Sequence, residues 1–298
     1  MTDLQRYLAE EVAVDHADGI ISRREALHRL ALMGWTVAAA ATLLTACGNE
    51  TKGAASPSPT PGESAGSDAS ASAASAITFA GPEGRTLQGG WAPASGSPRG
   101  AILVIHENKG LLDHFRVVAG RFASAGYSAL ALDLLSEEGG TASLGDSANA
   151  TAALSKIAPE RFVADMKAGL DELARRTPGV KLGAIGFCFG GGMMWRLVGS
   201  KDPRLAAAAP FYGPLPDAAD FTGAKTAVLG VYGALDARVN ASQAAATAAL
   251  EKAGLPHEIV TYPGADHAFF NDTGPRYNAE AAAQAWTKVL AWFGKYVG

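Results

Sequence analysis

The sequence predicts an α/β fold with a mainly parallel central sheet and helices on both faces, and three observations lead to this prediction. Strand-like and helix-like segments alternate from Ile77 to the end of the chain. Several strand segments are continuous apolar runs, which is typical of strands buried on both faces. Ligands bind beyond the carboxyl ends of such strands. Four of the strands are followed there by a residue suited to chemistry, namely Glu107, Cys188, Asp236 and His267.

The elements follow one another in a regular order. Residues 77–81 and 87–94 are expected to form two early strands, with a Gly- and Pro-containing turn between them. Later strands are short runs rich in Val, Leu, Ile and Ala, and the helices show apolar residues at a spacing of three to four. The other strand segments are 101–107, 127–135, 181–187, 205–213, 226–233 and 257–264, and the helical segments are 114–126, 160–176, 190–199, 241–254 and 278–297.

The N-terminal residues 1–46 are expected to be an export signal and not part of the fold. Arg23 and Arg24 precede an apolar stretch, residues 30–44, and resemble a twin-arginine signal. The stretch is shorter than the roughly 20 apolar residues that span a bilayer. "LTAC" ending at Cys47 resembles a bacterial lipobox, which predicts lipidation of that cysteine. The alternatives are an ordinary helix with a chance cysteine, or a signal cleaved without lipidation.

Residues 47–76 consist mainly of Ser, Ala, Pro, Gly and Thr. Such a segment cannot bury enough apolar surface to offset its ordering entropy, so a flexible tether is expected. It would join the lipid anchor to a catalytic domain of residues 77–298. The sequence therefore predicts an exported protein, anchored by lipid on the outer face of a bacterial cytoplasmic membrane or in the cell envelope.

Composition excludes several classes of function. The formal net charge of −4 argues against nucleic acid, which needs a basic surface to neutralise phosphates. The chain has two cysteines, Cys47 and Cys188, and if each has its own function no disulfide forms. No cluster of ligand residues has metal-binding spacing, and no glycine-rich loop follows a strand as a phosphate loop requires. We therefore expect neither a metal nor a cofactor.

The segment "GFCFG" (186–190) predicts a nucleophile elbow centred on Cys188. Glycines two residues before and after the centre are needed because side chains there would collide with the neighbouring strand and helix. The turn also places the sulfur at a helix N-terminus, where the helix dipole favours thiolate over a thiol of ordinary pKa about 8.5. The alternative is a buried structural cysteine in a glycine-rich packing site.

A thiol nucleophile needs a base, and His267 follows the last strand while Asp236 follows the preceding one. The order Cys188, Asp236, His267 is the nucleophile–acid–histidine order of the α/β-hydrolase fold. His267 would take the thiol proton and later activate water, and Asp236 would orient its ring. Asp266 is a weaker candidate for the acid because adjacent side chains rarely face each other.

Six separated motifs resemble the dienelactone hydrolase family of the α/β-hydrolase superfamily. They are "VIHENKGL", "ALDLL", "GFCFGG", "FYG", "GALDARV" and "DHAFFNDTGPRYN", within residues 77–298. The resemblance implies a triad of Cys188, Asp236 and His267. It also implies that Glu107 contacts the resting thiol and helps to deprotonate it, and that the backbone amides of Phe189 and Asn108 form the oxyanion hole.

The sequence departs from the founding dienelactone-cleaving enzymes at one position. They carry an arginine shortly after the catalytic histidine to hold the substrate carboxylate, and Asn271 stands there in this chain. Arg276 is the nearest arginine and a candidate for the same contact. Tyr212 and Phe269 are candidate pocket residues, although aromatic residues in such places are as often part of the core.

These features predict hydrolysis of small esters or lactones through an acyl-cysteine intermediate. The expected partner is a small-molecule ester or lactone, with no nucleic acid and no membrane contact beyond the lipid anchor. Two alternatives use the same fold: an exported lipoprotein that binds small ligands without turnover, and an acyltransferase that uses the same three residues with an acceptor other than water. Oxidation of an exported thiolate gives the binding alternative some weight.

Overall fold

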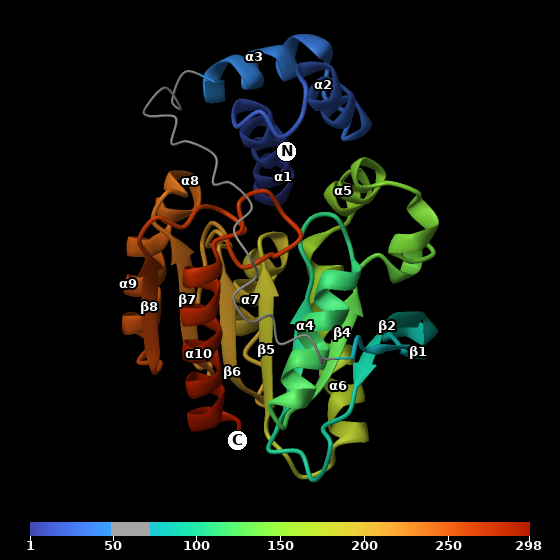
Figure 1. Ribbon diagram of the computed structural model, residues 1–298, viewed down its shortest axis with the longest axis vertical. Helices are drawn as coiled ribbons and strands as arrows, with labels where there is room; N and C mark the ends of the chain where they lie inside the picture. Colours follow the sequence, from blue (N-terminus) through green and yellow to red (C-terminus); the bar gives the residue numbers. More distant parts are fainter. Residues whose placement is uncertain (49–71) are drawn as a thin grey trace.

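The computed structural model describes residues 1–48 and 72–298. Its centre is one eight-stranded sheet with the strand order β1-β2-β4-β3-β5-β6-β7-β8 (Figure 1). β1 and β2 form an antiparallel hairpin, and β2 pairs antiparallel with β4. All pairings from β4 to β8 across the sheet are parallel. The prediction of a mainly parallel sheet is therefore confirmed.

The strands lie within a few residues of their expected positions, and the central ones are buried over their whole length. Every residue of β3, β4, β5 and β7 is buried, which explains why these segments are apolar without alternation. The strands are β1 Ser75–Ala80, β2 Thr86–Ala92, β3 Ala101–Ile105, β4 Ser128–Asp133, β5 Leu182–Phe187, β6 Leu205–Phe211, β7 Ala227–Gly233 and β8 His257–Tyr262.

Helices cover both faces of the sheet, as expected for parallel strands joined by crossovers. α4 (Asp113–Ser124) and α10 (Ala279–Tyr296) cover the near face in Figure 1, and α6 (Pro159–Arg176) and α7 (Phe189–Gly199) the far face. α9 (Gln243–Ala253) packs against β8. Within residues 77–298, two α-helices were not expected from the sequence. They are α5 (Ser147–Lys156), which lies between β4 and α6, and the short α8 (Ala237–Asn240) after β7.

Three N-terminal helices lie over the edge of the sheet where the parallel strands end (Figure 1). They are α1 (Asp3–Ala17), α2 (Arg23–Leu32) and α3 (Val37–Gly48). α1 contributes Leu4, Tyr7 and Leu8 to the main hydrophobic core. Its other face packs with α2 and α3 in a second apolar cluster, which is formed by Ala9, Val12, Ala13, Ala26, Leu30, Ala40 and Leu44.

The segment expected to be a tether, residues 47–76, lies for the most part outside the described residues. β1 already begins at Ser75, two residues before the expected start of the domain. Cys47 belongs to α3, but its side chain is outside the described part of the chain. Among residues 1–48 and 72–298, no helix combines the length and the apolar character that a membrane crossing needs. The export signal and the lipidation of Cys47 stay predictions.

Candidate active site

Cys188 stands between β5 and α7 in a strained backbone conformation. Its φ of 55° and ψ of −117° lie outside the regions that most residues adopt, and such a conformation costs on the order of 1–3 kcal/mol. The turn is held by the amide of Cys188, which donates to the carbonyl of Phe211 at 3.0 Å, and by the Gly192 amide, which donates to the Cys188 carbonyl at 3.0 Å. This geometry places the sulfur at the N-terminus of α7, where the helix dipole favours a thiolate.

The two flanking glycines are required by space. A Cβ on Gly186 would lie 2.2 Å from the carbonyl oxygen of Gly190, and a Cβ on Gly190 would lie 2.6 Å from the carbonyl oxygen of His106. Both obstacles are backbone atoms, so no side-chain rotation can remove the collision. The sharp turn therefore depends on glycine at both positions.

His267 and Asp236 meet beside the sulfur. The Nδ1 atom of His267 is 2.6 Å from Oδ2 of Asp236, and the other carboxylate oxygen accepts from the Val239 amide at 3.1 Å. A nitrogen of the imidazole lies within 4.8 Å of the Cys188 sulfur. Asp266 accepts from the backbone amide of His267 at 2.6 Å and so contacts the loop, while Asp236 contacts the ring.

The environment of His267 favours the protonated ring. Burial by itself lowers the pKa of the imidazole, but the negative charges of Asp236 and Cys188 outweigh this effect and raise the pKa from 6.5 to about 10. A protonated imidazole beside a sulfur at a helix N-terminus is the arrangement that stabilises a thiolate at neutral pH. The three groups can therefore supply a nucleophile, a proton carrier and an orienting acid.

Glu107 is buried near the same strand ends, but its contacts differ from those that the family resemblance implies. Its carboxylate accepts a hydrogen bond from the Tyr212 hydroxyl at 3.2 Å and one from the Asn271 amide group at 2.9 Å. The Cys188 sulfur instead contacts the Tyr7 hydroxyl at 3.2 Å. Asn271, which stands where an arginine was expected, thus serves as a neutral partner for Glu107.

The residues expected to form the oxyanion hole flank the elbow. Phe189 is the first residue of α7, and the amide of a first helical residue has no acceptor within its helix. Asn108 follows β3 in a loop that is fixed by the Thr151 hydroxyl, which donates to its carbonyl at 2.9 Å.

His106 is fully buried, and burial lowers its pKa in spite of the nearby Asp133 and Glu107 carboxylates. It bonds the Glu107 carbonyl through Nδ1 at 2.7 Å, which is a structural role.

The three expected substrate contacts have different surroundings. The Tyr212 ring packs edge-on to the His267 ring, with their centroids 5.2 Å apart. Phe269 is fully buried against Tyr212 at 5.6 Å and so belongs to the layer beneath the site. Arg276 pairs with two carboxylates of the N-terminal segment, Asp15 at 3.0 Å and Asp18 at 2.6 Å. With α1 in this position, the Arg276 guanidinium is paired with Asp15 and Asp18 and is not available to a substrate carboxylate.

Sequence reasoning missed Tyr7, Glu11 and Arg238 at this site. Tyr7 and Glu11 lie in the N-terminal segment, which was expected to be an export signal outside the fold. Glu11 on α1 lies 3.3 Å from Nε2 of His267 through Oε1, and the same oxygen forms an ion pair with Arg238 of α8. Arg238 also lies over the Tyr7 ring, with 4.7 Å to the centroid. A signal for α1 was present, since Thr2 and Gln5 form a capping box, which marks a helix start.

One group of side chains in the described part of the chain offers three possible metal ligands. Glu11, Cys188 and His267 each present one ligand atom, and these atoms lie within 4.8 Å of one another. The group does not show in the sequence spacing, because Glu11 reaches the site from a separate helix. His267 and Glu11 are engaged in the ion pairs described above.

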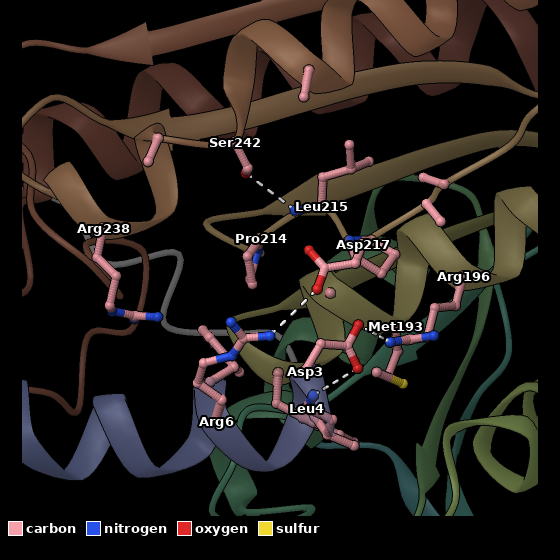
Figure 2. Close-up of a pocket in the computed structure, with 18 of the residues that line it drawn as sticks. Asp3, Leu4, Arg6, Met193, Arg196, Pro214, Leu215, Asp217, Arg238 and Ser242 are labelled. Atoms are coloured by element: carbon pink, nitrogen blue, oxygen red, sulfur yellow. Dashed lines mark hydrogen bonds and ion pairs between the residues drawn. The ribbon is translucent and has the colours of Figure 1, made fainter. Parts of the chain in front are cut away.

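A cavity of about 690 Å³ adjoins the elbow between α1 and the catalytic domain. Figure 2 shows its lining, with Arg6 and Asp3 of α1 paired to Asp217 and Arg196 on the other side. Phe189 and Tyr7 both line it. Because Tyr7 also touches the Cys188 sulfur, its side chain stands between the cavity and the reacting atom.

Comparison with known proteins gives concordant matches. The model of the dienelactone hydrolase family matches residues 89–297. A relative from Methylorubrum extorquens, named "Putative carboxymethylenebutenolidase", is 32% identical over 222 residues, which cover 68% of this chain and 75% of the relative. The residues that match the family model begin at 89, so the three N-terminal helices lie outside the matched region.

Two solved structures are similar over the catalytic domain. A "Putative Dienelactone Hydrolase" from Klebsiella pneumoniae is 30% identical with a TM-score of 0.65, and the match covers 74% of this chain and 98% of that one. A dienelactone hydrolase-like promiscuous phosphotriesterase from metagenomic libraries is 27% identical with a TM-score of 0.60, and the match covers 76% and 100%.

Proposed function

Because this chain belongs to the dienelactone hydrolase family, we propose that it hydrolyses small carboxylic esters or lactones through a cysteine nucleophile and an acyl-cysteine intermediate. The observation that carries the proposal is the meeting of three groups from separate loops. The Asp236 carboxylate, the His267 imidazole and the Cys188 sulfur follow one another in space, with 2.6 Å for the first contact and at most 4.8 Å for the second. Family membership favours hydrolysis over ligand binding alone and over acyl transfer.

The first half of the reaction forms the acyl-enzyme. The Cys188 thiolate attacks the carbonyl carbon, and the carbonyl electron pair moves to oxygen, where the amides of Phe189 and Asn108 stabilise the oxyanion. When the intermediate collapses, the carbon–oxygen bond to the leaving group breaks. The alkoxide or enolate takes the proton from the His267 imidazolium, and Asp236 holds the ring in position. The products are an alcohol or enol and an acyl-Cys188 thioester.

The second half releases the acid. The neutral His267 accepts a proton from water, and the hydroxide attacks the thioester carbon. The carbon–sulfur bond then breaks, so that the sulfur leaves as a thiolate and the imidazole is again protonated. The Asp236 carboxylate, which outweighs the opposing effect of burial, raises the pKa of His267 to about 10, so the imidazolium is ready to give its proton to the leaving group.

A trapping experiment tests the proposal. The chain and its Glu11→Arg variant, which weakens the contact of α1 with His267, are mixed with p-nitrophenyl acetate and quenched in acid within seconds, and their intact masses are measured. We expect the variant to gain the mass of one acetyl group, located on the peptide that contains Cys188 and removed by hydroxylamine. Rapid release of p-nitrophenol with the acetyl group on another residue would contradict a cysteine nucleophile. A panel of esters, lactones and one phosphotriester would then define the substrate class.

We further propose that the protein is exported and lipid-anchored through Cys47. The support is the sequence: paired arginines, a short apolar stretch and "LTAC". Arg23 and Arg24 are exposed at the start of α2, where a targeting receptor could reach them. The expected mature protein begins at Cys47 and carries lipid, which mass spectrometry of the membrane fraction of the producing bacterium would detect. A protein recovered there with residues 1–46 still attached would contradict the proposal.

A further inference from the structure

α1 lies across the site and turns one buried face of the helix towards it. Leu4, Tyr7, Leu8, Glu11 and Asp15 recur at a spacing of three to four and so share one face of the helix. All five are buried. The three apolar members join the core of the catalytic domain, and the two acidic members are paired with arginines of that domain. The helix is therefore docked through a specific surface.

Two side chains of this face touch the two reacting groups. The Tyr7 hydroxyl lies 3.2 Å from the Cys188 sulfur, and Glu11 lies 3.3 Å from Nε2 of His267. Burial and the charge of Cys188 raise the pKa of Tyr7, so the phenol keeps its proton and can donate it to the sulfur. With α1 in place, only 3% of Cys188 and 4% of His267 are exposed. An acyl group cannot reach a sulfur that is covered in this way.

The Glu11 carboxylate stands where the product of the proposed reaction would stand. Hydrolysis of the acyl-cysteine leaves a carboxylic acid beside both Nε2 and the sulfur, and this acid loses its proton to solvent and becomes a carboxylate. The Glu11 oxygen lies within 4.8 Å of that sulfur. Arg238 and the protonated imidazole compensate its burial, which would otherwise be costly for a carboxylate. The Glu11 side chain of α1 thus places a carboxylate where the carboxylate of a bound product would lie.

Ion pairs at the rim hold the ends of the helix. Asp3 pairs with Arg196 near the start of α1, and Asp15 and Asp18 pair with Arg276 at its end. Arg276 is 12% exposed, so its pairs are less screened than surface pairs. Acidic side chains on the helix therefore match basic side chains around the site, which is the charge complementarity expected of a docked partner.

We propose that α1 is an intramolecular inhibitor that occupies the catalytic site, and that the hydrolase becomes active only when α1 is displaced. This proposal rests on the proposed function. The family model begins at residue 89, so α1 is an addition that precedes the shared catalytic domain. If the export signal is removed before Cys47, hydrolysis of the Ala46–Cys47 peptide bond would separate all of α1 from that domain. The site would then be uncovered after export.

The test uses the full chain with Cys47→Ser, so that Cys188 is its one thiol. Glu11→Arg places a cation against Arg238 and the His267 imidazolium and should expel α1. We expect turnover of p-nitrophenyl acetate and alkylation of Cys188 by iodoacetamide to rise at least about tenfold, which is within the usual range of coupling between sites. The matched control is Glu251→Arg on α9, an exposed residue, which should leave both rates unchanged.

Two further measurements keep the test decisive. The double variant Asp15→Asn, Asp18→Asn loosens α1 without touching the reacting groups, and it should raise both rates if Glu11→Arg fails to fold. A synthetic peptide of residues 1–18, added to Glu11→Arg, should restore inhibition. Equal rates in the parent and in both variants would overturn the inhibitory role while leaving the hydrolase proposal intact. Faster alkylation without any ester turnover would support the inhibitory position and contradict the proposed function.

Discussion

Cys188→Ala is expected to lose ester and lactone turnover by roughly four to six orders of magnitude, as happens when the nucleophile of a triad is removed. Neither His267 nor Asp236 is expected to replace the sulfur, because the Asp236 carboxylate is held by Nδ1 of the imidazole and the raised pKa of His267, about 10, keeps its other nitrogen protonated. The measurement is kcat for p-nitrophenyl acetate, taken in the chain as it is and in the Glu11→Arg background, so that inhibition by α1 does not hide the effect.

The control for this experiment is Cys47→Ala, which removes the other cysteine and should leave kcat unchanged. The fold should also survive Cys188→Ala, because a smaller side chain at the elbow adds no contact, and circular dichroism would verify this. A folded Cys188→Ala variant with full turnover would rule out the acyl-cysteine route. Hydrolysis by a water that His267 activates directly would then be the remaining chemistry.

Asp236→Asn is expected to lower kcat by about 10⁴-fold, since an amide can no longer hold the histidine in the required tautomer. The matched control is Asp266→Asn, which changes a neighbouring carboxylate that contacts the backbone amide of His267 and not its ring. Its effect should stay below about tenfold. The two variants differ only in which of the two carboxylates beside His267 becomes an amide, so equal losses would show that Asp236 is not the orienting group.

The same variant has a defined pH dependence. The folded pKa of His267, about 10, is above its ordinary value of 6.5, so the stability it contributes is fully present below pH 6.5 and is lost as pH rises through 10. Asp236→Asn removes the largest cause that raises this pKa. The difference in free energy of unfolding between the parent and the variant should therefore be larger at pH 6.5 than at pH 10.5, as measured by urea denaturation. An equal difference at both pH values would contradict the charge pair.

Much of the fold could be predicted from local pattern because burial on both faces forces a strand to be apolar throughout. β3, β4, β5 and β7 are such strands, and each was located from its run of apolar residues. α5 was not predicted, because "SANATAALSK" is mostly small and polar and shows no strong apolar stripe. Its helical signal lies at its start, where the Asp146 side chain accepts from the Asn149 amide.

The site could be predicted only in part. Chain order located Cys188, Asp236 and His267, because strand ends on one edge of a parallel sheet must meet. The partners of Glu107 could not be predicted in the same way. Asn271 and Tyr212 reach its carboxylate from two other loops, and their directions depend on packing. Arg238 follows Asp236 by two residues, but its partner Glu11 lies 227 residues away in the chain, so local pattern could not indicate the pair.

By itself the sequence determined the kind of sheet, the strained glycine-flanked turn at Cys188 and the family to which the catalytic domain belongs. These properties follow from short-range pattern and from the order of strands. Only the tertiary structure decided that an N-terminal helix brings Tyr7 and Glu11 onto the sulfur and the imidazole. The physical reason is that docking depends on a match of shape and charge between two surfaces that are far apart in the chain. The residues of one surface do not indicate by themselves that the other surface fits them.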